Sequence, residues 1–323
     1  MENAPELSVL VPCYNERQSI PSFLEELIPV LDAIDIVWEI LFINDGSTDD
    51  TFDVLRQAHG KDSRVKCLSL SRNFGKEAAL TCGLNSAKSR GVLIMDADLQ
   101  HPPEIIPEMV RLWRQEKFDM VVPLNAERTG EGLIKKGLTR WYYHFLRIVT
   151  QVEILPGGSD FRLIDRKVIE VINRLPERNR FMKGIYAWPG FRTTSFPYSV
   201  RQRRFNVSKW KFGRLWNFAL DGIFGFSTFP LRLWTYIGFL IALLSFLRGL
   251  LIGVDALLHG IHVTRGVTTV AVFLFFLIGL LMISNGIQGE YLARVYEEVK
   301  GRPLYVIAAK IGFDETDNRA VDP

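Results

Sequence analysis

Between residues 7 and 123, short runs of apolar residues alternate with longer segments that repeat apolar residues at helical spacing. The short runs are almost continuously apolar, which is typical of strands buried on both faces, and such strands occur in parallel sheets covered by helices. The predicted strands are Leu7–Val11, Trp38–Ile43, Val65–Leu70, Val92–Met95 and Met120–Val122. The predicted helices are Ser19–Leu31, Asp49–His59, Lys76–Ser86 and Pro103–Gln115, with Ser47 or Thr48 as N-cap of the second. The sequence therefore predicts an α/β domain with a mostly parallel sheet.

A polar motif follows each of the first four predicted strands. The motifs are Pro12–Glu16, Asn44–Thr48, Ser71–Lys76 and Asp96–Gln100. The carboxyl ends of parallel strands meet at one edge of a sheet, and ligands of open α/β sheets bind beyond that edge. We therefore expect the four motifs to form one composite site.

The fourth motif carries two carboxylates, Asp96 and Asp98, one residue apart. Magnesium keeps several waters and is typically held by one or two carboxylates together with substrate phosphates, so the pair suits a divalent cation that holds a diphosphate. Asp96, Asp98 and Gln100 alternate along an expected extended segment and would project to one side. Taken alone, the motif is equally compatible with a solvated acidic turn. The three companion motifs favour the metal site.

Two stretches, Leu231–Val254 and Val267–Ile287, are almost uninterruptedly apolar. Each approaches the roughly 20 residues that cross a bilayer as a helix. The charges in the first are Arg232 at its start and Arg248 near its end, where long side chains can reach the headgroups, and the second has none. Two membrane spans are therefore predicted, and a pair of buried core helices is the alternative.

Basic residues flank the outer ends of the two stretches. They are Lys209, Lys211, Arg214 and Arg232 before or at the start of the first, and Arg294, Lys300, Arg302 and Lys310 after the second. In the connection between the stretches, residues 255–266, Arg265 is the only lysine or arginine. The positive-inside rule thus predicts a multi-pass protein of the inner or plasma membrane with both termini in the cytoplasm. The N-terminus lacks an apolar signal segment, so roughly the first 200 residues are expected to stay cytoplasmic.

The expected organisation is a cytoplasmic α/β domain at residues 1–210, a juxtamembrane amphipathic helix at 211–229, a two-helix membrane domain at 230–290 and a cytoplasmic tail at 291–323. Residues 130–150 mix basic and aromatic side chains, which favours a helix in the membrane interface; a packing helix of the α/β domain is the alternative. The net charge of +3 is too small to indicate nucleic-acid binding. Cys13, Cys67 and Cys82 have no Cys-x-x-Cys spacing and are expected to be reduced packing residues.

Seven segments in order resemble the inverting glycosyltransferases of family 2, and within them the polyisoprenyl-phosphate glycosyltransferases, which include the bactoprenol glucosyltransferases and dolichyl-phosphate mannose synthase. The segments are Val11–Glu16, Asn44–Asp49, Ser71–Lys76, Asp96–Pro103, Gly158–Leu163, Phe181–Gly184 and Gly289–Lys300. The resemblance covers nearly the whole chain and implies a GT-A, Rossmann-like fold. Asn44 stands where many members carry a second Asp, and Val207 stands where many carry Gly.

The resemblance also implies roles for particular residues. Those expected at the nucleotide sugar are Pro12, Tyr14, Glu16, Asp45, Asp96 and Ala97, and those expected at the Mg²⁺ or Mn²⁺ ion and donor phosphates are Asp96, Asp98 and Gln100. Arg128, Arg204 and Lys209 are expected at phosphates, although attraction to headgroups would also explain basic residues there. Asp160 is expected on the acceptor side, as base or as orienting group, beside Asp98 as the second catalytic residue; an ion pair with Arg162 or Arg166 is the alternative. His101 is expected to be a turn residue.

The implied reaction transfers a hexose, glucose from UDP-glucose, to undecaprenyl phosphate or a similar polyprenyl phosphate, with inversion and release of UDP. A phosphate monoester has a second pKa near 6, so the acceptor is mostly dianionic at neutral pH and needs no strong general base. The alternatives are another donor, such as GDP-mannose, UDP-GlcNAc or a UDP-aminopentose, or a catalytically inactive sensor or scaffold. Gly238, Gly249, Gly253 and Gly279 leave room for close helix packing, including in a homo-oligomer.

Overall fold

The computed structural model describes residues 5–125, 147–148, 159–178, 180–201, 227–259 and 266–313. The chain divides into two compact units, one comprising residues 1–215 and 302–323 and the other residues 216–301. Several predicted features lie outside the described residues. They are Arg128, Arg204, Lys209, the interfacial helix 130–150 apart from residues 147 and 148, most of the juxtamembrane helix 211–229, and the tail from residue 314.

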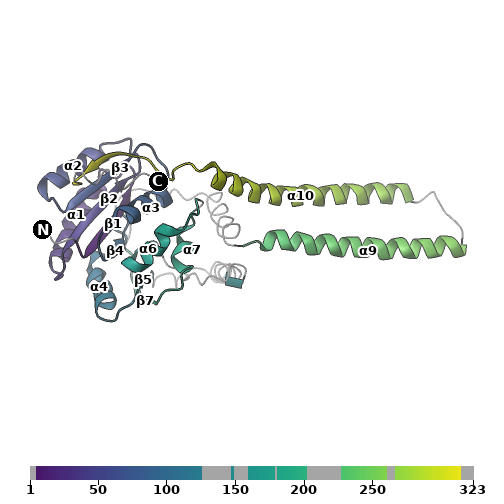
Figure 1. Ribbon diagram of the computed structural model, residues 1–323, viewed down its shortest axis with the longest axis horizontal. Helices are drawn as coiled ribbons and strands as arrows, with labels where there is room; N and C mark the ends of the chain where they lie inside the picture. Colours follow the sequence, from purple (N-terminus) through teal and green to yellow (C-terminus); the bar gives the residue numbers. More distant parts are fainter. Residues whose placement is uncertain are drawn as a thin grey trace. The chain divides into compact units, whose positions relative to one another are not determined.

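The first unit is built on a mixed sheet (Figure 1). Its strands in the described residues are β1 (Leu7–Cys13), β2 (Trp38–Asn44), β3 (Val65–Leu70), β4 (Gly91–Ile94), β5 (Met120–Asn125), β6 (Arg162–Asp165), β7 (Thr193–Tyr198) and β8 (Ile307–Ile311). Their order is β7-β5-β6-β4-β1-β2-β3-β8. The central strands β4, β1, β2 and β3 are parallel, as predicted, whereas β6 is antiparallel to both neighbours and β8 is antiparallel to β3.

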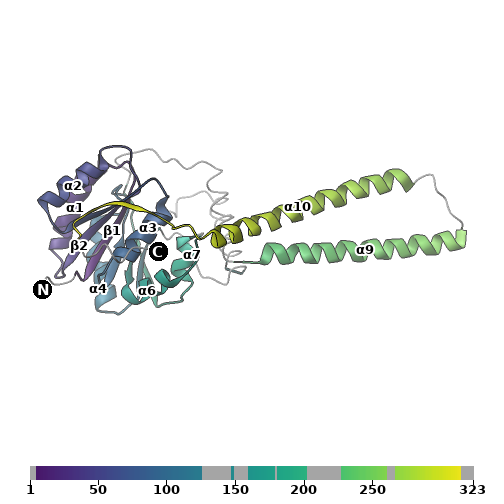
Figure 2. The same cartoon turned by 45° about the horizontal axis from the view of Figure 1, so that its top comes forward.

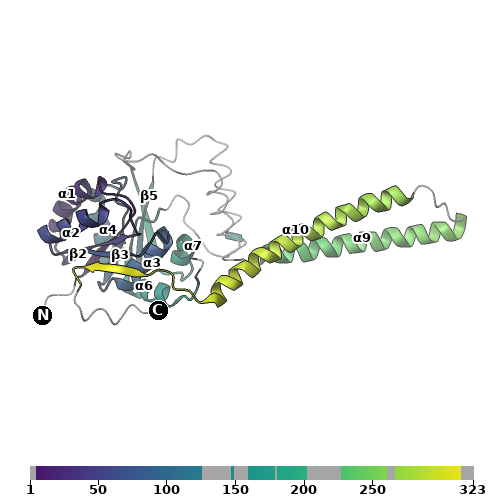
Figure 3. The same cartoon turned by 90° about the horizontal axis from the view of Figure 1, so that it is seen from above.

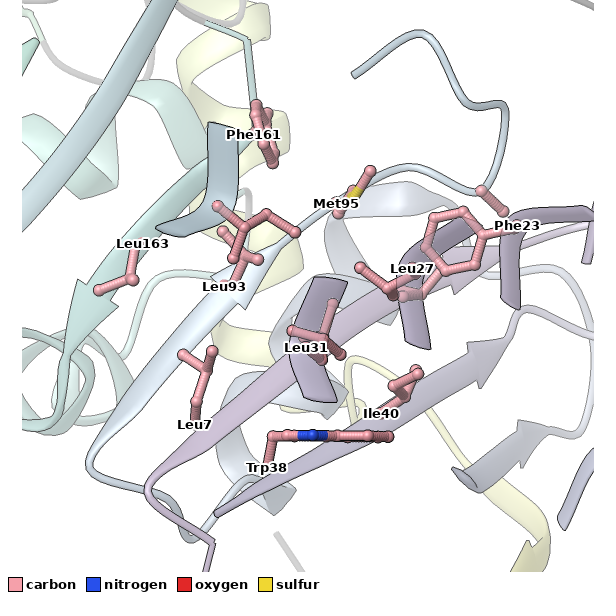
Figure 4. Packing of buried hydrophobic residues seen from close by; sticks show 14 of the residues in the cluster. Leu7, Phe23, Leu27, Leu31, Trp38, Ile40, Leu93, Met95, Phe161 and Leu163 are labelled. Carbon is pink, nitrogen blue, oxygen red and sulfur yellow. The ribbon is translucent and has the colours of Figure 1, made fainter. Parts of the chain in front are cut away.

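Helices cover both faces of this sheet (Figure 3). They are α1 (Ser19–Asp32), α2 (Thr51–Lys61), α3 (Lys76–Ser86), α4 (Ile106–Arg114, preceded by a 3-10 turn at Pro103–Ile105), α6 (Arg166–Arg174) and α7 (Met182–Ala187). Alternate strand residues face opposite sides. Leu7, Val9 and Val11 of β1 belong to a core cluster that also contains residues of α1 and α4. Figure 4 shows Leu7 of this cluster together with Leu27 and Leu31 of α1. Leu10, by contrast, lies against α3 at Gly83.

The predicted N-cap of α2 is wrong. The helix begins at Thr51, and its N-cap Asp50 makes no side-chain capping bond. Ser47 instead accepts a hydrogen bond from the Asn15 N–H at 2.9 Å, and the Thr48 N–H donates to Asn15 Oδ1 at 2.8 Å. Ser47 and Thr48 therefore connect the second motif to the first. Helix-capping preferences cannot predict this contact, because it is made between segments that are distant in the sequence.

The predicted boundary at residue 210 leaves out a strand of the sheet. Residues 307–311, expected in a separate tail, form β8, whose Ile311 pairs with Cys67 of β3. Nearby, Asn85 Nδ2 donates to the Tyr305 hydroxyl at 3.1 Å. The pairing covers the open edge of β3, which would otherwise expose unpaired backbone groups. The three cysteines are buried and free, as predicted.

The second unit contains α9 (Phe229–His259) and α10 (Gly266–Lys300), which contact each other. Within it the Tyr291 hydroxyl donates to the Ser227 carbonyl at 2.6 Å. In the described residues one helix, Phe273–Lys300, is long and apolar enough to cross a membrane, judged by length and composition, and Phe229–Ser245 is a shorter apolar helix. Two spans therefore remain a prediction. Figure 2 gives a second view of both helices.

Candidate active site

All four strand-end motifs contribute to one cavity of about 360 Å³. Its lining residues are Pro12, Cys13, Tyr14, Glu16, Asp45, Asn73, Gly75, Lys76, Ala79, Asp96, Ala97 and Asp98. The volume is in the range of small-molecule and cofactor sites. The expected composite site is therefore present at the carboxyl edge of the parallel strands.

The first motif is held in place by backbone and side-chain bonds to the second. Asn15 has a φ of 57°, a left-handed conformation that Asn adopts more readily than most residues. The Glu16 N–H donates to Thr51 Oγ1 at 2.9 Å, and the Glu16 carboxylate accepts from the Ser19 hydroxyl. Tyr14 remains 43% exposed, so its ring is accessible from the cavity.

Asp45 fixes the third motif. Its buried carboxylate accepts hydrogen bonds from the N–H groups of Phe74 at 2.7 Å and Gly75 at 2.9 Å. Burial raises the pKa of Asp45, although these two N–H groups act in the opposite direction. Asp45 thus shapes the loop that leads into α3, in addition to lining the cavity.

Asn44 uses both functions of its amide. Its Nδ2 donates to the Ser69 hydroxyl at 3.0 Å, and its Oδ1 accepts from the Ser47 N–H at 3.2 Å. A carboxylate has no N–H to donate, so the buried Asn44 suits this position as a structural link between two strand ends.

Gly46→Ala is expected to destabilise the first unit by more than about 2 kcal/mol. Gly46 has a φ of +62°, and a Cβ there would lie 2.2 Å from the backbone carbonyl carbon of Arg72. Gly60→Ala is the matched control, because Gly60 lies in α2 with nothing within 4 Å of an added Cβ. We expect the melting temperature of the detergent-solubilised protein to fall by at least about 4 °C for Gly46→Ala and to be unchanged or higher for Gly60→Ala. Equal melting temperatures for the two variants would contradict the close approach at Gly46.

The fourth motif forms a turn, and the prediction of an extended segment is wrong. Residues 97 and 98 are in a turn, and Leu99 has a φ of 57°. Asp98 Oδ1 accepts from the Gln100 N–H at 3.1 Å, a bond that stabilises the turn. Asp96, Ala97 and Asp98 line the cavity, but Gln100 does not. The cause is local: the side chain of Asp98 bonds the backbone two residues ahead.

Lys76 connects the two sides of the site. It is the first residue of α3, and its Nζ lies 2.7 Å from Asp96 Oδ1 and 3.0 Å from Asp160 Oδ2. Burial opposes the charge on Lys76, but the two carboxylates raise its pKa above the usual value. An ion pair with Arg162 or Arg166 was the alternative role for Asp160, but the ion pair in the structure is with Lys76.

Asp160 precedes β6 and is largely buried. Burial alone would raise the pKa of Asp160, but Lys76 and then Arg162 outweigh it and hold the pKa below its usual value. The carboxyl group is therefore ionised at neutral pH. The following residue, Phe161, stacks on His101 with ring centroids 4.5 Å apart.

His101 is buried and contacts the Tyr198 hydroxyl through Nδ1 at 2.7 Å. Burial lowers the pKa of its imidazole. His101 packs between two strand ends, consistent with its expected structural role, and does not line the cavity.

Glu77 and Arg162 both interact electrostatically with Asp160. From the sequence, Arg162 was considered only as an ion-pair partner of Asp160, and Glu77 was not singled out. Arg162 is buried, with its guanidinium 4.0 Å from the centre of the Tyr186 ring, and its Nη2 donates to the Ser159 carbonyl. Glu77 Oε2 is buried with no hydrogen-bond partner among the described residues. Burial, and then the charge of Asp160, raise the pKa of Glu77 to about 8.

The raised pKa of Glu77 predicts a pH-dependent stability. The folded protein keeps this proton up to about pH 8, whereas the unfolded chain releases it above about 4.5, so stability falls as pH rises between these values. Glu77→Gln is permanently neutral and should escape this loss. We expect it to melt higher than the parent at pH 8 and to differ less at pH 5, with the exposed Glu25→Gln as control. An identical difference at both pH values would show that Glu77 is ionised in the folded protein.

The structure thus brings most predicted residues together. Those lining the cavity are Pro12, Tyr14, Glu16, Asp45, Asp96, Ala97 and Asp98, and Asp160 joins them through Lys76. The sequence reasoning missed Asn73, Gly75 and Lys76 as individual site residues. Their position after the third strand was a usable signal, because they occupy the same sheet edge as the other motifs.

An open α/β sheet with carboxylates and a lysine around a cavity at its carboxyl edge is typical of nucleotide-binding proteins. The chain belongs to glycosyl transferase family 2, whose model matches residues 8–172. It is therefore a glycosyltransferase, and the family resemblance described above is confirmed.

Curated relatives match nearly the full length. An uncharacterized glycosyltransferase of Synechocystis sp. is 43% identical over 96% of this chain and 96% of its own length. The SfII prophage-derived bactoprenol glucosyl transferase of Shigella flexneri is 42% identical over 94% of this chain and 97% of its own. Among solved structures, glucosyl-3-phosphoglycerate synthase from Mycobacterium tuberculosis, in complex with Mn²⁺, UDP and phosphoglyceric acid, is 20% identical with a TM-score of 0.46, covering 68% of this chain and 76% of that one.

Proposed function

We propose that this enzyme transfers glucose from UDP-glucose to a polyprenyl phosphate such as undecaprenyl phosphate, with inversion, to give a β-linked polyprenyl-phosphate glucose and UDP. The observation that carries the proposal is the cavity lined by Asp96 and Asp98, in which Lys76 links Asp96 to Asp160. It provides a donor side and an acceptor side within one site. The relatives named bactoprenol glucosyl transferase support the choice of sugar and acceptor.

On the donor side, Asp96 and Asp98 fit a Mg²⁺ or Mn²⁺ ion. Both line the cavity with carboxylate oxygens, the ligands that such cations prefer. In the described residues no three His, Cys, Asp or Glu side chains converge as a metal site, which suits an ion completed by water and the donor diphosphate. The ion would neutralise charge on the departing UDP. Pro12, Tyr14 and Glu16 line the part of the cavity proposed for the nucleoside.

On the acceptor side, Asp160 is proposed as the group that orients the lipid phosphate. Its lowered pKa makes it a weak base, and a dianionic phosphate is already nucleophilic. Positioning and charge screening are then the main tasks of the protein. Arg128, Arg204 and Lys209 are proposed to supply positive charge where the two phosphates approach.

The second unit is proposed to anchor the enzyme in the membrane through α9 and α10 as two spans. The basic residues at and beyond the outer ends of both helices support cytoplasmic termini and a cytoplasmic catalytic unit. Such an anchor would keep the enzyme at the membrane that holds its lipid phosphate acceptor. Glycines such as Gly238 and Gly279 would permit a homo-oligomer.

The test is turnover by the purified full-length protein with a short prenyl phosphate and a panel of nucleotide sugars, with and without divalent metal. We expect glucosyl transfer from UDP-glucose, loss of activity in a chelator and a β-linked product. Preference for GDP-mannose, UDP-GlcNAc or a UDP-aminopentose would correct the donor. An α-linked product would exclude single displacement, and UDP binding without transfer to any acceptor would favour a sensor or scaffold.

A further inference from the structure

Lys76 follows a loop whose backbone is held by the second motif. It follows Gly75, whose φ of +100° turns the chain into α3, and the two preceding N–H groups are bound by the Asp45 carboxylate. Its Nζ contacts both oxygens of Asp96, at 2.7 and 3.0 Å, and Asp160 at 3.0 Å. The backbone that carries the ammonium group is thus fixed by the second motif.

This ion pair involves a carboxylate proposed to bind metal. Lys76, Asp96 and Asp98 line the same cavity, and the ammonium group of Lys76 contacts Asp96. A divalent cation at Asp96 and an ammonium group in contact with the same carboxylate repel each other, and the repulsion is strong where water is partly excluded. Metal binding and the present Lys76–Asp96 contact therefore oppose each other.

Lys76 can bind phosphate when a nucleotide-sugar donor occupies the cavity. A lysine is a compact charge with three donors on a flexible four-carbon stem, and it binds phosphate readily. Because Lys76 itself lines the cavity, its ammonium group can turn from Asp96 to an anionic group bound there without movement of α3. Asp160 can stay in contact with the ammonium group while it moves away from Asp96.

We propose that Lys76 is an internal counter-ion that competes with the divalent metal for Asp96, so that metal alone binds weakly and metal together with a nucleoside diphosphate binds tightly. The diphosphate accepts the ammonium group that the metal displaces. This inference rests on the proposed function for the metal and the diphosphate, but not on the identity of the sugar or lipid. It makes the binding of metal and diphosphate mutually reinforcing, and such coupling is reciprocal.

The test is direct titration of Mn²⁺ into the full-length protein, followed by electron paramagnetic resonance of free Mn²⁺, with and without saturating UDP. Lys76→Met keeps the length of the side chain and removes its charge. We expect it to bind Mn²⁺ alone about tenfold more tightly than the parent, because the competing charge is gone. UDP should then strengthen Mn²⁺ binding about tenfold less than in the parent.

Two further variants serve as controls. Lys76→Arg keeps the charge and should retain weak binding of Mn²⁺ alone, whereas Lys61→Met removes an exposed lysine at the end of α2 and should behave as the parent. Thermal melting gives a second readout. Metal-free Lys76→Met leaves Asp96 and Asp160 without their cation, so Mn²⁺ alone should raise its melting temperature more than that of the parent.

The outcomes separate this inference from the proposed function. If the parent binds Mn²⁺ more tightly with UDP but Lys76→Met shows the same affinities and the same Mn²⁺-induced melting shift, the counter-ion role is wrong and the proposed function stands. If Mn²⁺ binds to neither protein with or without UDP, the metal in the proposed function is wrong and the inference falls with it.

Discussion

Asp98→Asn is expected to weaken Mn²⁺-dependent binding of UDP by at least about 100-fold, since mutations of groups that merely support metal ligands already cost up to that factor. The amide that replaces the carboxylate would keep the Oδ1 that accepts from the Gln100 N–H, so the turn should persist while the charge is lost. Isothermal titration with UDP, in Mn²⁺ and in a chelator, measures the effect.

The control for this prediction is Asp53→Asn. Asp53 pairs with Arg56 on the exposed surface of α2 and lies outside the cavity, so its loss should leave UDP binding unchanged. The weak binding of UDP in chelator should be the same for Asp98→Asn and the parent. If the variant binds UDP with Mn²⁺ as tightly as the parent does, Asp98 is no metal ligand.

The second large effect is expected for Asp160→Asn, which should reduce kcat about 100-fold, the scale of losses when a reacting group is misplaced. The amide has the same shape but no charge to hold Lys76 or to orient the acceptor. UDP affinity in Mn²⁺ should change little, because Asp160 does not line the cavity proposed for the nucleotide. Steady-state kinetics together with UDP titration separate the two effects.

Glu170→Gln is the control for Asp160→Asn, since Glu170 is an exposed carboxylate on α6. Its kcat should match that of the parent. Unchanged turnover in Asp160→Asn would remove Asp160 from the mechanism, and a parallel loss of UDP affinity would place it on the donor side. The kcat of the parent could depend on pH near neutrality, and that of Asp160→Asn could be independent of pH. This result would indicate that Asp160 acts as a base instead of an orienting group.

Long-range contacts explain two of the errors of the sequence reasoning, and a local side-chain bond explains a third. Ser47 looked like a helix cap because its type and position fit one, yet its hydroxyl is used by the backbone of Asn15. Residues 307–311 carry little strand signal, and their strand forms because β3 offers an unpaired edge. The Asp96–Gln100 segment was expected to be extended, but the Asp98 side chain bonds the Gln100 N–H and favours a turn.

The sequence by itself determined the central parallel strands, the helices between them, the family and the sheet edge where the site forms. These features follow from local patterns. A strand buried on both faces needs a continuous apolar run, and a polar motif directly after such a run marks the carboxyl end of the strand, where ligands bind. Only the tertiary structure decided that Lys76 joins Asp96 to Asp160 and that Asp45 holds the loop before it. Lys76 and Asp96 are 20 positions apart, and Asp160 lies further along the chain. Such partners meet only through the fold, because no local pattern specifies which carboxylate a lysine reaches.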